Sequence, residues 1–292
     1  MKNFKKLALM GLTAVMSLSL LAACGGGNSG SAETPANNTE TPSVENTETP
    51  AASGEFTTVE AGKLIMSTNA QFPPYEMVGD GEGYEGTGYE GIDVEIAYAI
   101  AQKLGLELVV DNMGFDAALQ AVQTGKSDIV MAGVTVTDDR LEVMDFSDTY
   151  ANGIQVVIVP ENSDIATIDD LEGKLIGCQM GTTGYIYCSD TPENGGYGED
   201  AVIPYDDGAA AIQALMNGQV DCVVIDNAPA QEYVKANPGL KILDTEFANE
   251  NYAIGFAKGN TALKDAVNTA LNELIEDGTV QSIIDKYIPA EG

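Results

Sequence analysis

Short apolar segments alternate with amphipathic helical patterns from about residue 63 onward, and this alternation constrains the fold more than any other feature of the chain. In the first half, the helical patterns place apolar residues three and four positions apart and end at Gly105 and Gly125. Asp93 stands where the N-cap of the first helix is expected. The predicted order is strand 63–67, helix 94–104, strand 106–110, helix 115–124 and strand 129–132.

The second half of the chain repeats the pattern. It predicts strand 175–179, a helix over 209–216 that ends before Gly218, and strand 222–225, which runs into Asp226. Two more helices follow, over 261–277 and from Thr279 onward, separated by Gly278. Strands that alternate with helices of this length form βαβ units, so we expect an α/β fold with two α/β units. A chain of 292 residues is long enough for two lobes of this kind.

The charged residues exclude several classes of function. The chain has 13 Lys and Arg against 45 Asp and Glu, a formal net charge of −32, which argues against binding to nucleic acid. It contains no histidine, which excludes Ser-His-Asp and Cys-His catalysis and every zinc or haem site that needs an imidazole. Arg140 is the only arginine, so its position needs a specific explanation.

The amino terminus is typical of an export signal. Three lysines within the first six residues precede an apolar run over 7–21, too short for a comfortable membrane span. The sequence Leu21-Ala22-Ala23-Cys24 resembles the lipobox of bacterial lipoproteins, which implies a signal peptide over 1–23 and a lipid anchor, with acyl chains such as palmitate, on Cys24. The alternative is an ordinary cleavage site beside a chance cysteine. Small and polar residues then dominate a predicted disordered tether over 24–56, and the folded part begins near Thr57.

Two motifs suggestive of nucleotide binding have the wrong context. Gly81, Gly83 and Gly86 spell G-x-G-x-x-G, but no helix with apolar periodicity opens there, so we interpret the segment as a loop. Gly125-Lys126-Ser127 matches the end of a phosphate-binding loop, yet it follows a helix and position 120 is Gln where a glycine is required. The sequence therefore predicts no nucleotide site.

Several segments together carry a resemblance to a known family. They are NAQFPPYE at 69–76, GIDVE at 91–95 and AGVTVTDDR at 132–140, with further matches at 145–147, 181–183 and 277–279. Over the span from Lys63 to Tyr287 the chain resembles the polar amino acid-binding proteins of bacterial ABC importers. The resemblance implies an α/β, two-lobed, periplasmic-binding-protein-like clamp with two interlobe crossings. Lobe one would comprise 57–151 plus 252–292, and lobe two 152–251.

The resemblance also implies a function and its partners. A free L-amino acid would bind in the interlobe cleft, and permease subunits of an ABC importer would receive it. The protein would be a monomer, held to the extracytoplasmic face of the cell membrane by its lipid anchor. Neither catalysis nor a cofactor nor nucleic acid would be involved.

Two residues offer the charges that an amino acid ligand requires. Arg140 can present two parallel N–H donors to the α-carboxylate, and in the family this position grips the ligand. Asp226 ends an apolar strand, where the clefts of open α/β sheets lie, and occupies the place of the family's ammonium-binding carboxylate. The alternatives are a surface salt bridge for Arg140, to Asp138, Asp139 or Asp145, and a helix cap for Asp226.

The resemblance assigns seven further residues to the site. Gly133 would give a backbone carbonyl to the ammonium, Thr135 a hydroxyl and N–H to the carboxylate, and Thr183 a backbone N–H from the other lobe, although a threonine in such a turn is equally often a cap. The side-chain pocket would consist of two aromatic walls and two amides, Phe72, Phe115, Asn69 and Gln179. Aromatic residues at such spacing are more often plain core. Amides and ring faces favour a polar or basic ligand, with a slight preference for a basic one.

Other interpretations of the sequence remain open. An exported dehydratase-like enzyme on the same fold would need an acid in the cleft, and Glu76 is a candidate expected near its rim. A receptor sensor domain would need a membrane span and an output domain. Cys178 and Cys188 could form a disulfide, whereas Cys222 is expected to be a buried free thiol. The acidic stretches 80–90 and 190–200 could hold calcium but lack EF-hand spacing, so solvated loops are expected.

Overall fold

The computed structural model describes residues 56–289. Its strands are β1 (Lys63–Thr68), β2 (Gln71–Phe72), β3 (Glu76–Val78), β4 (Tyr89–Glu90), β5 (Glu107–Asn112), β6 (Ile129–Val130), β7 (Met144–Pro160), β8 (Ile176–Gln179), β9 (Val202–Tyr205), β10 (Cys222–Asp226), β11 (Leu240–Ile242) and β12 (Ala248–Ala257). Its α-helices are α1 (Ile92–Leu104), α2 (Phe115–Gln123), α3 (Asp138–Val143), α4 (Thr183–Ser189), α5 (Gly208–Met216), α6 (Asn227–Ala236), α7 (Thr261–Glu276) and α8 (Thr279–Tyr287). None of the helices in this range has the length and hydropathy of a membrane span. The predicted signal peptide over 1–23, the predicted lipidation of Cys24 and all but the last residue of the predicted tether lie outside the described residues.

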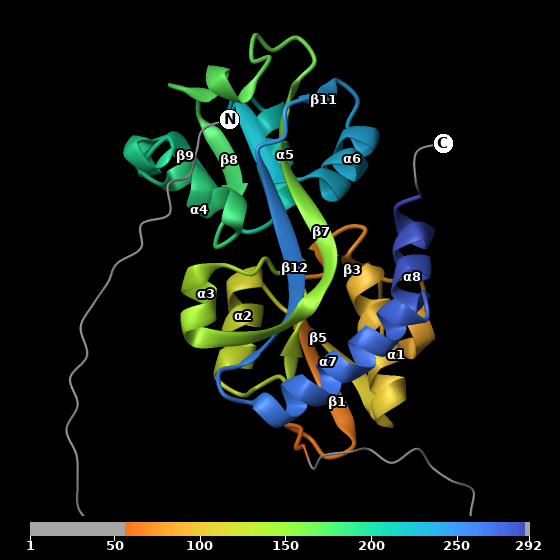
Figure 1. Ribbon diagram of the computed structural model, residues 1–292. Coiled ribbons are helices and arrows are strands. Elements are labelled where there is room, and N and C mark those ends of the chain that lie inside the picture. Colours follow the sequence, from red (N-terminus) through yellow and green to blue (C-terminus); the bar gives the residue numbers. More distant parts are fainter. Residues whose placement is uncertain (1–55, 290–292) are drawn as a thin grey trace, which may run out of the picture. The chain divides into compact units, whose positions relative to one another are not determined.

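Two long antiparallel strands, β7 and β12, form the middle of the main sheet (Figure 1). The strand order is β5-β1-β6-β12-β7-β10-β8-β9, and β11 pairs with the end of β7. On one side of the long pair, β5, β1 and β6 are parallel to one another; on the other side, β10, β8 and β9 are parallel to one another. The sheet therefore consists of two halves, each made of parallel strands. The long strands β7 and β12 lie between the halves and join them.

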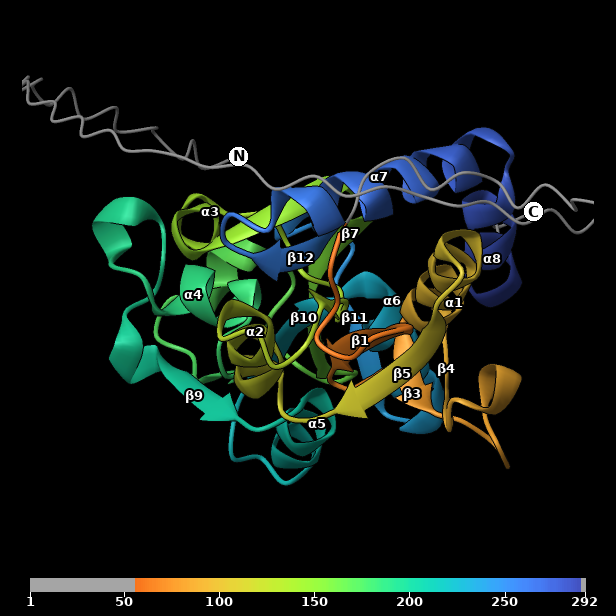
Figure 2. The same cartoon turned by 90° about the horizontal axis from the view of Figure 1, so that it is seen from below.

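The helices divide between the two halves of the sheet. Helices α1, α7 and α8 pack together beside β5 and β1, with α2 and α3 on the same half, whereas α4, α5 and α6 surround β8, β9 and β10 (Figures 1 and 2). We call the first half, together with the separate small sheet β2-β3-β4 beside α1, lobe one and the second half, with β8–β11, lobe two. Each lobe has its own buried apolar clusters, with Ile96 and Phe256 in lobe one and Ile158 and Leu215 in lobe two. The two-lobed α/β clamp expected from the sequence is the fold observed.

Most of the predicted elements are present, with shifted ends. Strand 63–67 extends to Thr68, strand 106–110 is observed as β5, and the helix expected over 261–277 is α7. Strand 129–132 is shorter than expected, because the ladder ends at Val130 and the chain turns away at Gly133, which has φ +55°. The loop assigned to the G-x-G-x-x-G segment is confirmed, since this segment holds only a short 3-10 turn between β3 and β4.

One local prediction is wrong. Asp93 does not cap α1, because the N-cap position is Gly91 and Asp93 lies inside the first turn, fully buried. Its carboxylate instead accepts hydrogen bonds from the Gly133 backbone N–H at 3.0 Å and from the Tyr150 hydroxyl at 2.8 Å. The sequence pattern assigned the Asp93 side chain to a helix end. In the structure this side chain instead connects α1 to β7 and to the loop after β6.

The three cysteines within residues 56–289 are buried free thiols in lobe two. Cys178 in β8, Cys188 in α4 and Cys222 in β10 belong to one apolar cluster. Burial raises the pKa of the Cys222 thiol, which keeps it protonated, as expected for a packed thiol. The possible disulfide between Cys178 and Cys188 is not formed in the structure.

Candidate functional site

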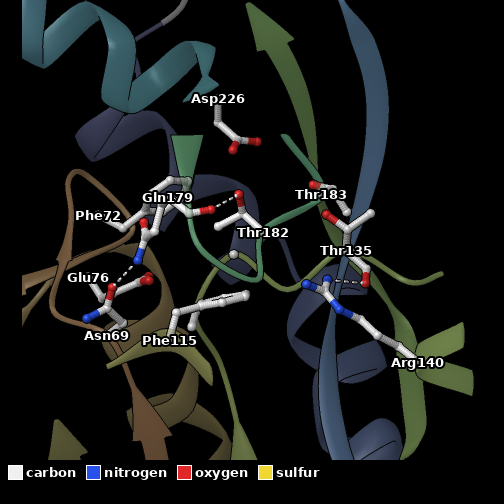
Figure 3. Close-up of a pocket in the computed structure, with 12 residues that line it drawn as sticks. Asn69, Phe72, Glu76, Phe115, Thr135, Arg140, Gln179, Thr182, Thr183 and Asp226 are labelled. Carbon is white, nitrogen blue, oxygen red and sulfur yellow. Dashed lines mark hydrogen bonds between the residues drawn. The ribbon is translucent and has the colours of Figure 1, made fainter. Parts of the chain in front are cut away.

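A pocket lies between the two lobes, and all nine residues proposed from the sequence line it (Figure 3). The full lining is Asn69, Phe72, Glu76, Phe115, Ala132, Gly133, Thr135, Arg140, Gln179, Thr182, Thr183 and Asp226. The cavity measures about 20 Å³, room for roughly one water molecule. The pocket as it stands in the structure therefore has no room for a molecule the size of an amino acid.

The topology of the sheet explains why these residues meet. Strands β1, β6, β8 and β10 each lead directly into a segment that lines the pocket, at residues 69–76, 132–135, 179–183 and 226. The carboxyl ends of parallel strands are where open α/β sheets form their clefts, because the chain leaves the sheet there. Segments as far apart in sequence as Asn69 and Asp226 are thereby brought to one site.

Arg140 is held in a fixed position inside the pocket. Thr137 caps α3 by accepting the Arg140 backbone N–H at 3.2 Å, and the guanidinium is buried, with the side chain 8% exposed. Its NH1 donates to the Thr135 carbonyl at 2.8 Å, and its NH2 donates to the Gly181 carbonyl of lobe two at 3.2 Å. The group also lies 5.5 Å from the centre of the Phe115 ring, close enough for a cation–π interaction.

The surface salt bridge considered for Arg140 is not present. Of the three candidate partners, Asp145 pairs with Lys258 at 3.0 Å, and no ion pair within residues 56–289 joins Arg140 to Asp138 or Asp139, both of which are exposed. Burial lowers the pKa of Arg140, and nearby carboxylates, Glu250 foremost, oppose that effect. The arginine is therefore a buried cation whose hydrogen bonds go to neutral carbonyls, and only two of its five N–H groups are used by them.

Asp226 is a buried carboxyl at the carboxyl end of β10, 8% exposed. It stands at the N-cap position of α6, but its side chain makes no capping hydrogen bond. The carboxylate instead accepts from Gln155 Nε2 at 2.7 Å and from the Tyr252 hydroxyl. Burial and the neighbouring Glu250 raise the pKa of Asp226 well above its ordinary value. A ligand cation beside Asp226 would reverse this effect by favouring the charged form.

The remaining polar residues of the site bond mainly to one another. Gln179 donates to the Asn69 side-chain oxygen across the pocket at 2.9 Å, and Asn69 donates to the Met113 carbonyl at 2.9 Å. Thr182 is the cap of α4, accepting the Tyr185 backbone N–H, so Thr183 occupies the first helical turn, and both residues line the pocket. The amide pair and the start of α4 therefore both belong to the lining, and their contacts with a ligand stay a prediction.

The aromatic walls are also in place. Phe115 is 8% exposed at the start of α2, and Phe72 lies in β2 with its ring centre 5.7 Å from that of Tyr75. A Cβ at Gly133 would come within 2.8 Å of the Phe72 ring, and the positive φ of Gly133 disfavours other residues too. Glycine at this position therefore lets the Phe72 ring pack against the backbone that faces the pocket.

Two buried acids at the site were not assigned from the sequence. Glu250 in β12 is 4% exposed and accepts from the Thr135 hydroxyl at 2.9 Å and from Gln155 Nε2 at 3.1 Å. The Thr135 hydroxyl expected to face a ligand is thus engaged with Glu250. Glu76, expected near the rim of the cleft, is fully buried and lines the pocket. The sequence held no clear signal for Glu250, which stands between Asn249 and Asn251 at the polar start of β12.

Comparison with known proteins identifies the family. Residues 64–290 match the bacterial extracellular solute-binding proteins, family 3. The chain belongs to this family. A probable histidine-binding protein of Neisseria gonorrhoeae is 34% identical over 79% of this chain and 85% of its own length, and the arginine-binding extracellular protein ArtP of Bacillus subtilis is 31% identical over 78% and 87%.

Solved structures agree with this membership. The arginine-, lysine-, histidine-binding protein ArtJ of Geobacillus stearothermophilus has 33% sequence identity and a TM-score of 0.70, over 79% of this chain and 96% of ArtJ. An ancestral arginine-binding protein bound to arginine has 39% identity and a TM-score of 0.69, over 78% of this chain and 98% of its own. The family is one of extracellular binding proteins, which accords with the clamp fold and the pocket between its lobes.

Proposed function

We propose that this protein captures a basic L-amino acid, and other polar L-amino acids less tightly, in the pocket between its lobes and delivers it to an ABC importer. The observation that carries the proposal is the pairing of a buried guanidinium, Arg140, with a buried carboxyl, Asp226, in the lining of one pocket. An α-amino acid carries one carboxylate and one ammonium on the same carbon. A receptor with one fixed cation and one fixed anion matches both groups.

The α-carboxylate is bound by Arg140 in this proposal. The three N–H groups of its guanidinium that are not used by carbonyls are charge-assisted donors, and the N–H at Thr183, near the start of α4, favours an anion as well. The ammonium is bound by Asp226, with the Gly133 carbonyl as a second acceptor. Thr135 contributes its backbone N–H, since its hydroxyl is held by Glu250.

The side-chain end of the pocket favours a cation. Arg140 lies on one side of the pocket, whereas Asn69, Phe72 and Glu76 lie on the other (Figure 3). The lining holds no other cationic side chain, so a ligand carboxylate at the far end would face ring faces, amides and the acid Glu76. An aliphatic side chain would separate the bonded amides of Asn69 and Gln179, at about 1 to 3 kcal/mol for each unsatisfied group. A guanidinium or ammonium group instead gains the rings and a carboxyl partner.

The same contacts imply hinge closure. Arg140 and Asp226 come from different lobes, and the small cavity requires the cleft to open for entry. We place the lobe limits at 57–151 plus 252–292 and 152–251, with crossings near Gln155 in β7 and Tyr252 in β12; the β7–β12 register shifts just after Tyr252. Ligand then favours the closed state because it bonds to both lobes at once. An unchanged radius of gyration in small-angle scattering at saturating ligand would count against closure.

We propose that the protein is a monomer tethered to the extracytoplasmic face of the membrane. The lipobox-like sequence before Cys24 and the polar composition of 24–56 support this arrangement. Mass spectrometry of the mature protein from its native host should find a diacylglyceryl group on Cys24. An unmodified Cys24 in that protein would contradict the anchor.

Titration calorimetry against the common amino acids tests the proposed ligand. The mature chain carrying Cys24→Ser, which removes the lipid but keeps the tether, should bind arginine, lysine or histidine most tightly, glutamine more weakly, and glutamate and leucine least. Tighter binding of glutamate or leucine than of every basic and amide amino acid would overturn the pocket assignment.

One observation favours a second candidate function, an exported dehydratase-like enzyme that acts on a small carboxylate. Glu76 is a buried acid in the pocket whose pKa burial raises, as a proton donor to a leaving group would require. A binding protein returns its ligand unchanged. Proton NMR of the bound amino acid, recovered after a day with the protein, therefore separates the two candidates, and only new resonances would support the enzyme.

A further inference from the structure

Two buried carboxyl groups, those of Glu76 and Asp93, interact with each other, and Glu76 belongs to the lining of the pocket. Both side chains are fully buried, Glu76 in β3 and Asp93 in α1. Within residues 56–289, no N–H group or hydroxyl donates to either oxygen of Glu76. The Asp93 carboxyl interacts with that of Glu76, and a hydrogen bond between the two acids would satisfy an otherwise unpartnered oxygen of Glu76. Such a bond exists only if one of the two carries a proton.

The surroundings give this pair no cation. The other titratable groups around it are the phenols of Tyr75 and Tyr150 and the carboxyl of Asp226, so none of them supplies positive charge. Asp93 accepts from the Gly133 N–H and the Tyr150 hydroxyl, which stabilises its negative charge but leaves Glu76 without help. Two adjacent carboxylates cannot both ionise in such a site, so the pair retains a proton.

The one buried cation of the site is already committed elsewhere. Arg140 lies on the opposite side of the pocket and donates to the carbonyls of Thr135 and Gly181 (Figure 3). Glu76, in contrast, belongs to the lining near Asn69 and Phe72, where the proposed function puts the ligand side chain. A cationic side chain that enters this end of the pocket therefore reaches Glu76 before it reaches Asp93.

We propose that the Glu76–Asp93 pair exchanges its proton for the cation of a basic ligand side chain. The ligand cation binds beside Glu76, the proton shared by the two carboxyls leaves to solvent, and the net charge of the site stays the same. No covalent bond other than the O–H bond breaks, and water or buffer takes the proton. This inference rests on the proposed function and adds to it a proton released for each basic ligand captured.

The pKa directions agree with the exchange. Burial and the neighbouring Asp93 raise the pKa of Glu76 well above its ordinary value, and burial raises the pKa of Asp93 to about 6. A cation beside the pair favours the ionised form, so ligand lowers these pKa values. Below the pKa of the free pair, the affinity for a basic ligand then rises roughly tenfold per pH unit, and above it the affinity becomes independent of pH.

Arginine and citrulline form a matched pair of probes, since citrulline replaces the guanidinium by a neutral group of nearly the same shape. Both are titrated calorimetrically between pH 5 and pH 8, in two buffers of different ionisation enthalpy, into the full mature chain carrying Cys24→Ser. Near pH 5.5, arginine binding should release about one proton and citrulline binding none. Between pH 5 and 6, arginine affinity should rise about tenfold while citrulline affinity stays constant.

The variant Glu76→Gln supplies the control for the pair. It keeps the shape of the side chain and removes the acid that faces the ligand. Arginine should bind about a hundredfold more weakly than to the wild type near pH 7, without proton release and without dependence on pH. Urea unfolding of the variant shows whether it is folded, and arginine should lose more affinity than citrulline, because only arginine brings a cation to the position of Glu76.

The outcomes separate this inference from the proposed function. Arginine that binds tightly with no proton release, or a Glu76→Gln variant that keeps the pH dependence, overturns the exchange and leaves the proposed function standing. Wild-type protein that binds citrulline or glutamine but not arginine overturns the basic specificity, and the exchange with it. If Glu76→Gln binds neither probe, Asp93→Asn replaces it: loss of the Asp93 charge lowers the pKa of Glu76, so the pH at which arginine affinity becomes constant should fall, and an unchanged pH dependence overturns the exchange.

Discussion

Replacement of Arg140 by alanine should abolish useful binding of amino acids. The guanidinium uses two N–H groups for the Thr135 and Gly181 carbonyls, which leaves three of its five for the ligand carboxylate. Two charge-assisted hydrogen bonds are each worth about 1.5 to 3 kcal/mol. Their loss predicts an affinity lower by about 4 kcal/mol, on the order of a thousandfold.

The substitution should leave the fold intact. Burial of the guanidinium is itself unfavourable, as the lowered pKa of Arg140 indicates, and its partners within residues 56–289 are two backbone carbonyls rather than a salt bridge. We therefore expect the free energy of unfolding to change by no more than about 2 kcal/mol. Urea unfolding without added ligand measures this change separately from binding.

Two further variants make the comparison specific. Arg140→Lys keeps the charge but loses the planar fork, and it should bind about thirty- to a hundredfold more weakly than the wild type. Lys235→Ala removes a cation outside the pocket, with a side chain 78% exposed and 3.7 Å from Glu232, and it should bind normally. Titration calorimetry that finds Arg140→Ala within tenfold of the wild type would refute the assignment of the carboxylate site.

Three other predictions follow from the buried acids. Asp226→Asn should weaken amino acid binding at least a hundredfold, which calorimetry measures. The fold should be kept, because Gln155 can turn its unpaired buried oxygen toward the new amide, and urea unfolding checks this part. Glu250→Gln should bind the amino acid within about tenfold of the wild type, since a glutamine oxygen still accepts from Thr135 and Gln155. Glu250→Ala should lose more than about tenfold in affinity. Equal affinities of the two variants would contradict a positioning role for Glu250. In the ligand-free chain, the free energy of unfolding should fall as the pH rises from about 4 to 6. The pKa of Asp93 is raised from 3.8 to about 6, so the folded state binds the proton more tightly than the unfolded state does. The difference corresponds to at most about 3 kcal/mol. Urea unfolding at pH 5 and pH 7 should show this difference, and Asp93→Asn should reduce it.

The sequence predicted those parts of the fold and site whose signals are local. Apolar periodicity and terminal glycines located the helices, since α1 ends at Gly105 in a left-handed conformation. Arg140 and Asp226 were assigned because each is chemically distinctive: one is the only arginine, and the other follows an apolar strand. The nine assigned side chains line one pocket, although their contacts with a ligand stay a prediction.

The features that the sequence did not predict depend on contacts between distant residues. Thr135 and Glu250 are 115 positions apart, and a chain with 45 acids does not reveal which of them is buried. Glu76 was placed at the rim because acids are normally solvated, whereas the β2–β3 turn carries it inward. The long strand β7 was not anticipated either, because it mixes exposed polar residues with buried apolar ones along 17 residues and so lacks one clear period.

The double crossing by β7 and β12 has a consequence for how the chain is made and exported. Lobe one is built from both ends of the folded region, so its core stays incomplete until the final segment of the chain has emerged. The members of that core contributed by β12, α7 and α8 are Tyr252, Ile254, Phe256, Leu263, Val267, Ala270, Leu271, Leu274 and Val280. Lobe two lies within one continuous stretch and has no such delay. During vectorial synthesis, the amino-terminal half of lobe one therefore lacks the apolar partners that it needs to fold early. We therefore expect the first part of the chain to stay unfolded, and so fit to be threaded across a membrane, until the final segment has emerged.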